Sequence, residues 1–307
     1  MSASAPQPHR TAVAVIGLGS IGGVVAGCLL HADRHDVVAC VRRPLERLTV
    51  ERPEGTVEVN LRALTDPERA TRVDWVLLAT KAHHTASAAP WLTGLCGPST
   101  RVAVLQNGID HAARVAPFIG GATAVPVMVY FNGERLAPDR MRMRHVGGAA
   151  DMEVANDPDG CALAQLLEGT PIGVQLIADF KTQAWRKLLV NAVANPVTCL
   201  TLRRQEVLRR QDIHALCLAV LEEAASVARA DGAQVAPGEP AQTMAKLMTF
   251  GPELGTSMYF DRLAGRPLEV EALTGAIVAA GERLGIPTPL NGALLALLRA
   301  VSDGANA

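Results

Sequence analysis

The chain lacks a net charge of either sign, because its 29 Lys and Arg residues nearly balance its 30 Asp and Glu residues and leave a formal charge of −1. Without an overall basic or acidic field, it has no general attraction for nucleic acid or for an anionic membrane. Any anionic ligand must therefore be bound at a local site. We predict a small-molecule ligand, with no nucleic-acid and no membrane partner.

Charged residues are also scarce, at 19% of the 307 residues against 49% hydrophobic residues. Disordered chains have the opposite composition, so we expect a globular protein with large buried cores. Domains usually contain about 100 to 200 residues, which predicts two of them here. The chain shows neither an internal repeat nor a low-complexity segment, so these domains are not expected to be copies of each other.

No two cysteines form a CxxC pair, which argues against a zinc ribbon or a redox centre. The six are scattered, as Cys28, Cys40, Cys96, Cys161, Cys199 and Cys217. We interpret them as buried thiols of a reducing compartment and predict a cytoplasmic protein. His83 and His84 have no cysteine or carboxylate at ligand spacing, so we expect exposed loop residues and no metal site.

An almost uncharged run from Ala12 to Leu30 follows Arg10, and its VAGC sequence, ending at Cys28, resembles the cleavage box of an exported lipoprotein. The run contains five glycines: Gly17, Gly19, Gly22, Gly23 and Gly27. Glycine weakens a helix by roughly 1 kcal/mol relative to alanine, so the run would make a poor signal or membrane-spanning helix. We therefore do not expect export.

The glycines instead follow the order of a nucleotide-binding turn. A β-branched run from Val13 to Ile16 precedes a Gly-x-Gly-x-x-Gly sequence and a helix of small residues, and a second strand is predicted from Asp36 to Val41. In such a unit the first glycine permits the tight turn, the second lets the backbone approach a pyrophosphate, and the third lets helix and strand pack closely. The predicted cofactor-binding turn consists of Gly17, Leu18, Gly19, Ser20, Ile21 and Gly22.

Arg42 and Arg43 follow the second predicted strand, where an NAD enzyme normally carries an acid that accepts hydrogen bonds from the ribose. A guanidinium cannot accept those bonds but can bind a 2′-phosphate through two parallel ones. The pair therefore favours NADP(H). The alternative is a solvated pair of loop arginines.

Two further buried strands are predicted, from Trp75 to Ala79 and from Val102 to Leu105. They run into Lys81 and Asn107, which places polar groups at the carboxyl ends of parallel strands, where such sheets bind ligands. Lys81 would add charge near the cofactor phosphates, and Asn107 an amide near the nicotinamide ribose or the substrate. Alternatively, Lys81 is a solvated lysine and Asn107 starts an ordinary turn.

The rest of the first half, to Ala178, contains further strand-like pieces, TAVPVMVYF, MRMRHV and PIGVQLI. We expect an irregular connection between Asn132 and Met141, and we assign His145 no role beyond that of a strand-end residue. Residues 1–10 are predicted to be a disordered tail. Residues 11–178 are thus predicted to form a doubly wound α/β domain of the Rossmann type that binds NADP(H).

After Ala178 apolar residues recur at helical spacing, which predicts an all-α domain over residues 179–307. Pro and Gly breaks separate expected helices at roughly 182–195, 203–231, 238–250 and 267–285.

The first of these helices carries Lys187, Asn191 and Asn195, four residues apart each time, so that all three lie on one stripe. Asn is a poor helix former and occurs here twice on one face, which favours a polar cleft over the alternative, a solvent-facing stripe. Pro196 is expected to end or kink this helix.

Taken together, these motifs resemble the ketopantoate reductase (2-dehydropantoate 2-reductase) family along nearly the whole chain. The matching pieces are GLGSIGG, CVRRP, ATK, QNG, AWRKLLVNAVANPVTCL, TSMYFD and RPLEVEALTGAIV. The resemblance implies a Rossmann domain followed by a helical domain, with the active site in the cleft between them and, for such a helical domain, a possible homodimer.

The resemblance also implies a role for each matching residue. Lys187 corresponds to the catalytic lysine, and Glu269 to a carboxylate near substrate and lysine that also contacts the cofactor; alternatively, Glu269 is a helix N-terminal carboxylate favoured by the dipole. Substrate contacts correspond to Asn107, Asn191, Asn195 and Ser257, and cofactor contacts to Arg42, Lys81 and Asn107. Leu254 departs from the family, which carries an asparagine three residues before the serine, and leaves the exact substrate open.

The function implied by the resemblance is NADPH-dependent reduction of a 2-oxo acid to a 2-hydroxy acid, specifically 2-dehydropantoate to (R)-pantoate in pantothenate and coenzyme A biosynthesis. Lys187 would stabilise and protonate the oxyanion that forms. The alternatives are a reductase of a different 2-oxo acid and a non-catalytic NADP-binding protein.

Overall fold

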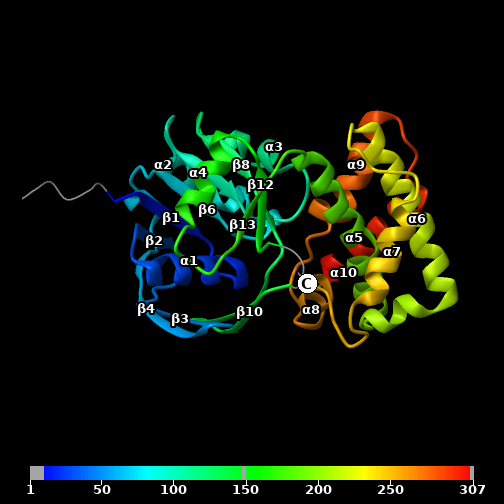
Figure 1. Cartoon of the computed structure of the whole chain (residues 1–307), viewed down its shortest axis with the longest axis horizontal. Helices are drawn as coiled ribbons and strands as arrows, with labels where there is room; N and C mark the ends of the chain where they lie inside the picture. Colours follow the sequence, from blue (N-terminus) through cyan, green and yellow to red (C-terminus); the bar gives the residue numbers. More distant parts are fainter. Residues whose placement is uncertain (1–9, 147–149, 305–307) are drawn as a thin grey trace, which may run out of the picture. The chain divides into compact units, whose positions relative to one another are not determined.

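The structure is a computed structural model that describes residues 10–146 and 150–304. The chain divides into two compact units (Figure 1). The first contains the chain to Gln106 and His111–Ala178, and the second contains Asn107–Asp110 and the chain from Asp179. Most of the predicted tail, residues 1–9, lies outside the described residues. The last residue of this predicted tail, Arg10, is exposed and forms an ion pair with Oδ1 of Asp33 at 2.7 Å.

The first unit is built on a six-stranded parallel sheet in the order β5-β2-β1-β6-β7-β8. This is the strand order of a dinucleotide-binding sheet. The chain first adds strands on one side of β1 and then crosses over to add β6, β7 and β8 on its other side. The four strands predicted for it are confirmed to within one residue at each end, because strands buried on both faces read as apolar runs. The strands are β1 (Ala12–Ile16), β2 (Asp36–Cys40), β5 (Arg62–Leu64), β6 (Trp75–Leu78), β7 (Arg101–Val104) and β8 (Thr123–Pro126).

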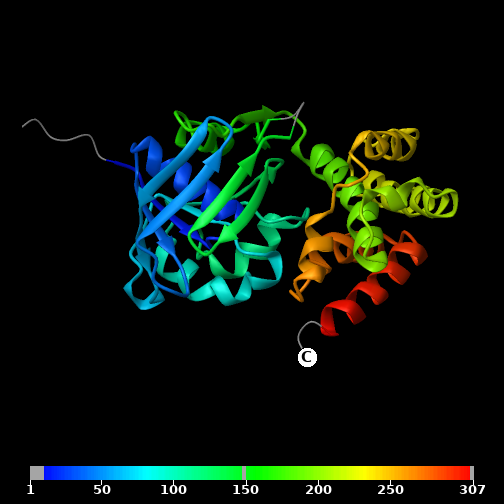
Figure 2. The ribbon, with the colours of Figure 1, turned by 90° about the horizontal axis from the view of Figure 1, so that it is seen from below.

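Helix α1 (Ser20–Ala32) lies between this sheet and a second one, of order β10-β11-β3-β4 (Figure 1). The helix needs small residues on the faces that it turns toward each of the two sheets, because larger side chains would collide with residues there. A Cβ added to Gly22 would lie 2.8 Å from Cβ of Ala79, and one added to Gly23 would lie 2.6 Å from Cγ of Met141. The second sheet consists of β3 (Arg47–Arg52), β4 (Gly55–Asn60), β10 (Asn132–Ala137) and β11 (Arg140–Arg144), and Figure 2 shows it in front of α1.

The irregular connection predicted between Asn132 and Met141 is wrong, because this segment forms β10 and the start of β11. The two strands pair antiparallel, with Asn132 opposite Arg144. β10 is an edge strand with mostly exposed side chains, so it lacks the apolar alternation by which a strand is recognised in sequence. Pairing with β11 and packing on α1 select the extended conformation instead. His145 directly follows β11, as expected of a strand-end residue.

A three-stranded sheet of order β13-β12-β9 completes the strands of the first unit, and hydrophobic cores fill both faces of the parallel sheet. Its strands are β9 (Met128–Val129), β12 (Met152–Ala155) and β13 (Val174–Ile177). The helices are α2 (Ala89–Leu95), α3 (His111–Val115) and α4 (Pro158–Leu166), with 3₁₀ turns η1 (Pro67–Arg69), η2 (Ala82–His84), η3 (Ala86–Ala88) and η4 (Ala116–Phe118).

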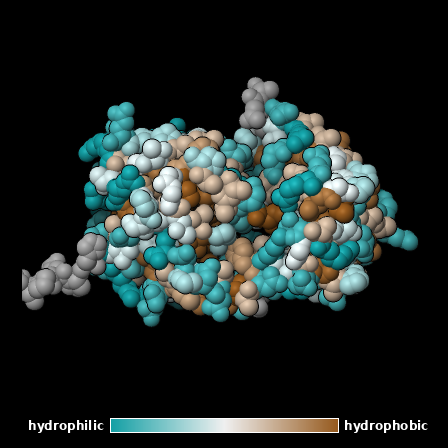
Figure 3. All heavy atoms as spheres, turned by 90° about the horizontal axis from the view of Figure 1, so that it is seen from above, coloured by the Kyte–Doolittle hydropathy of each residue, from teal (hydrophilic) through white to brown (hydrophobic). Residues whose placement is uncertain are grey.

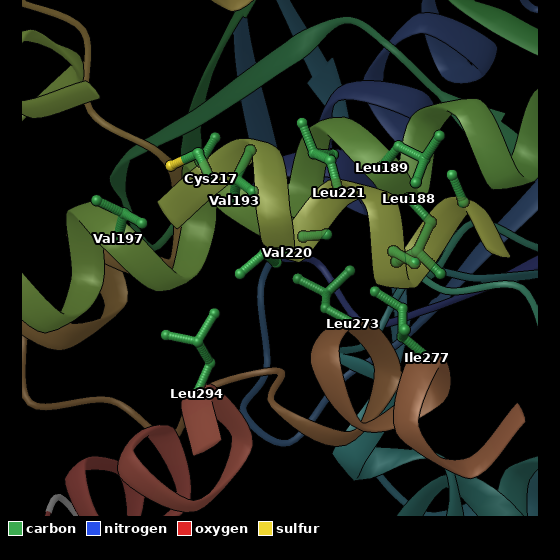
Figure 4. Close-up of a cluster of buried hydrophobic side chains, with 14 of the residues drawn as sticks. Leu188, Leu189, Val193, Val197, Cys217, Val220, Leu221, Leu273, Ile277 and Leu294 are labelled. Carbon is green, nitrogen blue, oxygen red and sulfur yellow. The ribbon is translucent and has the colours of Figure 1, made fainter. Parts of the chain in front are cut away.

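In its described residues the second unit is helical, as predicted, with α5 as its central rod. Leu188, Leu189 and Val193 of α5 pack with Val220 and Leu221 of α6 in the core that Figure 4 shows. The helices are α5 (Phe180–Thr201), α6 (Gln211–Ala230), α7 (Glu239–Thr249), α8 (Ser257–Leu263), α9 (Ala276–Leu284) and α10 (Pro289–Gly304), with a 3₁₀ turn η5 (Gln205–Arg209) and a π-helical turn η6 (Glu271–Gly275).

Three expected helix boundaries are wrong, one of them because the segment expected to be helical from residue 267 becomes helical only at Glu271. α5 continues through Pro196 to Thr201, because burial of Val197 and Cys199 in the core offsets the hydrogen bond that proline cannot donate. The segment expected to be one helix over 203–231 is interrupted, and α6 begins only at Gln211, because η5 and the extended Arg210 precede it.

Hydrophilic side chains spread over the surface of both units in Figure 3, and hydrophobic areas on this face are small and separate. Among residues 10–146 and 150–304, every helix is too short or too polar to span a bilayer.

Candidate active site

The glycine turn after β1 has the geometry of an anion-binding site. Gly17 has φ +92°, a conformation that favours glycine, and an added Cβ would lie 2.8 Å from Cγ2 of Thr80. Gly19 is the N-cap of α1, has no side chain to bond the first amides, and borders open space where a Cβ would stand. The N-terminus of α1 thus offers N–H groups and room for a phosphate, so these residues fit a dinucleotide.

The cationic candidates also lie at the carboxyl edge of the parallel sheet. Arg42 and Arg43 are exposed and follow β2, while Lys81 is half-buried and is the N-cap of η2 after β6. Within the described chain, neither Arg42 nor Arg43 has an ion pair, so both guanidinium groups can bind an anion. His83 and His84 are exposed, as expected.

Gln106, the residue after Leu105 at the end of β7, is a functional candidate that sequence reasoning passed over. Its side chain is 4% exposed and bonds to three other segments. Nε2 donates to Oγ1 of Thr80 at 3.0 Å and Oγ1 of Thr85 at 2.9 Å, and Oε1 accepts from Nη1 of Arg114 at 3.1 Å. The only sequence signal was its place in the QNG motif.

In the second unit, the predicted polar stripe of α5 becomes more buried toward its C-terminal end. Asn195 is 4% exposed, and Lys187 and Asn191 are half-buried. The solvent-facing alternative is therefore wrong for Asn195, because α8 packs against this part of α5.

A directed chain of hydrogen bonds joins Asn195 to its neighbours. Its Oδ1 accepts from the backbone N–H of Met258 at 3.3 Å and lies 3.5 Å from Oγ of Ser257, and its Nδ2 donates to Oδ1 of Asn191 at 3.0 Å. A backbone N–H can only donate, so the Met258 contact decides which end of the Asn195 amide is oxygen. Asn191 therefore turns its own NH₂ group away from Asn195, as a donor for another group.

The position of Ser257 is set by the same contact between α5 and α8. Thr256 is the N-cap of α8, accepting from the N–H of Tyr259, and its Oγ1 lies 2.8 Å from Oγ1 of the buried Thr198 on α5. Ser257 itself is exposed. An exposed hydroxyl on a doubly anchored turn is suited to bind a ligand.

Glu269 lies near Asn107, although 162 positions separate them in the chain. The carboxylate is 6% exposed, and its Oε2 accepts from Nδ2 of Asn107 at 3.2 Å within the second unit. Glu269 precedes the π-helical turn η6, so it is not a residue of the helix itself. The structure thus brings together Asn191, Asn195 and Ser257 in one group and Asn107 and Glu269 in another.

Leu254, the departure from the family pattern, is 47% exposed. Its carbonyl accepts from the N–H of Gln205 at 2.9 Å, so the backbone of this turn is held while the side chain remains outside the core. An apolar side chain here can contact a ligand but cannot donate a hydrogen bond to it.

Five of the six cysteines are poor nucleophiles, because they are buried and their thiols resist deprotonation. Cys161 is half-buried and the other five are buried. Burial raises the pKa of the Cys28, Cys40 and Cys217 thiols to about 12 and of Cys96 and Cys199 to about 11. Within the described ranges, no cluster of three or more His, Cys, Asp or Glu residues is arranged to hold a metal ion.

Comparison with known proteins identifies the family. Residues 13–157 match the family described as "Ketopantoate reductase PanE/ApbA", and residues 179–302 match "Ketopantoate reductase PanE/ApbA C terminal". The chain belongs to the ketopantoate reductase family. A 2-dehydropantoate 2-reductase of Caulobacter vibrioides is 40% identical over 295 residues, covering 95% of this chain and 99% of its own.

Solved structures of ketopantoate reductases share the whole fold. A PanE/ApbA family ketopantoate reductase from Ralstonia eutropha JMP134 has a TM-score of 0.86 at 27% identity and covers 96% of this chain and 100% of its own. A dimeric ketopantoate reductase from Staphylococcus aureus has a TM-score of 0.84 at 25% identity, covering 96% and 99%.

Proposed function

We propose that this chain reduces 2-dehydropantoate (ketopantoate) to (R)-pantoate with NADPH, a step of pantothenate and coenzyme A biosynthesis. The name of the Caulobacter vibrioides relative supports the reaction at 40% identity over nearly the full length. The observation in the structure that favours it most is the directed chain from Met258 through Asn195 to Asn191, because it presents amide donors suited to the oxygens of a 2-oxo acid.

The proposed cofactor contacts are the turn Gly17–Gly22 with Arg42 and Lys81 in the first unit, and Asn107 and Glu269 in the second unit. When bound, NADPH supplies the hydride for the 2-oxo carbon. The first amides of α1 would hold its pyrophosphate, and Arg42 would bind its 2′-phosphate. Asn107 would contact the nicotinamide ribose through its side-chain amide, whose orientation Glu269 fixes by accepting from Nδ2.

Lys187 is the proposed general acid. As hydride reaches the 2-oxo carbon, negative charge develops on the carbonyl oxygen, and the ammonium group both stabilises this charge and donates the proton that completes the hydroxyl group. Glu269 would accept a hydrogen bond from a substrate hydroxyl or pair with the lysine. Its burial favours such a role, because a carboxylate removed from water needs polar partners.

Asn191, Asn195 and Ser257 form the proposed substrate-binding group. Asn191 would donate to the substrate carboxylate or hydroxyl, and Ser257 would bind a second substrate oxygen. Asn195 would orient the side chains of Asn191 and Ser257. The amides orient the substrate without adding charge, which leaves the developing oxyanion to Lys187.

A second candidate function is reduction of a different 2-oxo acid. Leu254 favours it, since this exposed side chain replaces an amide by an apolar group. A substrate with an alkyl or aryl group in place of a hydroxyl would suit it better.

The deciding experiment follows NADPH absorbance with purified protein and a panel of 2-oxo acids that includes ketopantoate. The highest kcat/KM for ketopantoate is expected. A higher value for another 2-oxo acid would establish the second candidate, and NADPH binding without turnover of any panel member would indicate a non-catalytic protein. NADH in place of NADPH tests the cofactor preference in the same assay.

We further propose that residues 11–178 act as the cofactor domain and residues 179–307 as the substrate domain. The substrate domain would also form the interface of a homodimer, and the protein would be cytoplasmic. The dimeric relative from Staphylococcus aureus and the absence of any disulfide among the described cysteines support these assignments.

A further inference from the structure

Gln106 lies at the junction of three segments on the carboxyl edge of the parallel sheet. Its side chain donates to Thr80, whose Cγ2 is the nearest atom to the position of a Cβ on Gly17. The carboxamide therefore ties the exit of β7 to the exit of β6, and Thr80 in turn lies against the exit of β1.

The same side chain also reaches the turn that contains Lys81. Nε2 of Gln106 lies 3.4 Å from the carbonyl oxygen of Lys81 and donates to the hydroxyl of Thr85, the residue that closes this turn, at 2.9 Å. The hydroxyl of Thr85 also donates to the carbonyl of Ala82 at 2.8 Å. The turn from Thr80 to Thr85 is thus held to Gln106 at both of its ends.

The remaining polar groups of Gln106 anchor it to α3. Its Oε1 accepts from Arg114 at 3.1 Å, and its backbone carbonyl lies 2.8 Å from Nε2 of His111. A side chain that is 4% exposed and bonded in four directions cannot change its orientation without leaving buried polar groups unpaired, which costs roughly 1 to 3 kcal/mol for each.

We propose that Gln106 is a positioning residue for the cofactor, acting through Lys81 and the Gly17 turn without contacting the ligand itself. This rests on the proposed role of Lys81 as a phosphate contact. With Gln106 in place, the Lys81 backbone is held beside the glycine turn, so that its ammonium group is presented in one position before the cofactor arrives.

The test compares Gln106→Met, Lys81→Ala and the double variant by fluorescence titration with NADPH. Gln106→Met and Lys81→Ala are each expected to raise the Kd about tenfold, equivalent to about 1.4 kcal/mol. The double variant is expected to resemble Lys81→Ala alone, because Gln106 acts through that lysine.

Thr100→Val is the matched control, since Thr100 is 2% exposed and stands at the opposite end of β7, where its hydroxyl donates to the carbonyl of Val73 at 2.7 Å. It is expected to lower the melting temperature without changing the Kd for NADPH. If Gln106→Met fails to fold, Thr85→Val tests the same contact with a smaller change, and a several-fold rise in Kd is expected.

The outcomes separate the inference from the proposed function. If Lys81→Ala leaves the Kd unchanged, the phosphate role of Lys81 is wrong. If Lys81→Ala weakens binding while Gln106→Met and Thr85→Val do not, or if the effects of Gln106→Met and Lys81→Ala simply add, the positioning role of Gln106 is overturned.

Discussion

Nδ2 of Asn195 donates a hydrogen bond to Oδ1 of Asn191, one turn earlier in α5, at 3.0 Å. This contact gives the two asparagines of the stripe different roles. Asn195 is buried and uses both ends of its amide inside the fold, whereas Asn191 is half-buried and keeps its NH₂ group for another partner. Asn195 thus orients the residue that would meet the substrate.

Asn195→Asp tests this relationship. The carboxylate still accepts from Met258 but cannot donate to Asn191, whose amide then loses its fixed orientation. We expect the KM for the 2-oxo acid to rise about tenfold or more, with the KM for NADPH unchanged. The matched control is Asn291→Asp, the same change at a buried asparagine that donates to Glu223 at 2.9 Å, which should destabilise the fold without altering either KM. An unchanged substrate KM in Asn195→Asp would contradict the assignment.

Lys187→Ala tests the general acid. Turnover is expected to fall by roughly a hundredfold or more, as is typical when a general acid is lost, while the Kd for NADPH changes little. Lys181→Ala provides the control on the same helix, because Lys181 is exposed and pairs with Asp231 at 3.1 Å. Wild-type turnover in Lys187→Ala, measured by NADPH absorbance, would show that Lys187 is not the general acid.

Arg42→Ala tests the choice of cofactor. Loss of the guanidinium removes two hydrogen bonds to a 2′-phosphate, so the KM for NADPH should rise at least about tenfold while that for NADH stays the same. Arg47→Ala, at an exposed arginine that pairs with Glu58 at 3.0 Å, should change neither constant. Equal effects of Arg42→Ala on the two cofactors would show that Arg42 does not read the phosphate.

Gly133→Ala tests whether β10 braces the phosphate turn. An added Cβ would lie 2.6 Å from the carbonyl oxygen of Ser20, the first residue of α1, so the helix start must shift. We expect weaker NADPH binding together with a stability loss of about 1 to 3 kcal/mol, typical of overpacking. Gly27 lies farther along α1, and a Cβ added there would meet Val50 of β3. Gly27→Ala is therefore expected to lose stability with an unchanged Kd for NADPH. A Kd for Gly133→Ala equal to that of wild type would contradict this bracing.

His145 gives the first unit a pH-dependent contribution to stability. The hydrogen bond between its Nδ1 and Asp151 at 2.6 Å raises the pKa of His145, and Glu54 adds to the effect. Because the folded-state pKa lies above the unfolded value of about 6.5, the contribution is full below that pH and is lost as the pH rises through the folded-state pKa.

The melting temperature of His145→Gln should therefore fall below that of wild type at about pH 6, and the difference should shrink toward about pH 9. His84→Gln is the control, since His84 is exposed and its ring lies edge-on against His83 rather than beside a carboxylate. A difference that grows as the pH rises would mean that the sign is wrong.

The parts of the fold that could be predicted from sequence are those whose signal is local. The strands of the parallel sheet are buried on both faces and read as apolar runs, and the helices of the second unit carry apolar residues at helical spacing. β10 could not be recognised because its side chains face solvent, and α5 continues through Pro196 because of packing that no local rule contains. α8 and α10 were also not anticipated as separate helices.

The sequence by itself determined the glycine turn and the spacing of Lys187, Asn191 and Asn195, because a turn conformation and a helical stripe depend only on neighbouring residues. Tertiary structure alone decided that Asn195 is tied to Met258, that Glu269 accepts from Asn107, and that Gln106 holds the turn of Lys81. Each of these contacts joins segments far apart in the chain. The direction of a hydrogen bond between two side-chain amides is set by a third group, as the N–H of Met258 sets the orientation of Asn195. Such relationships exist only once the segments have packed.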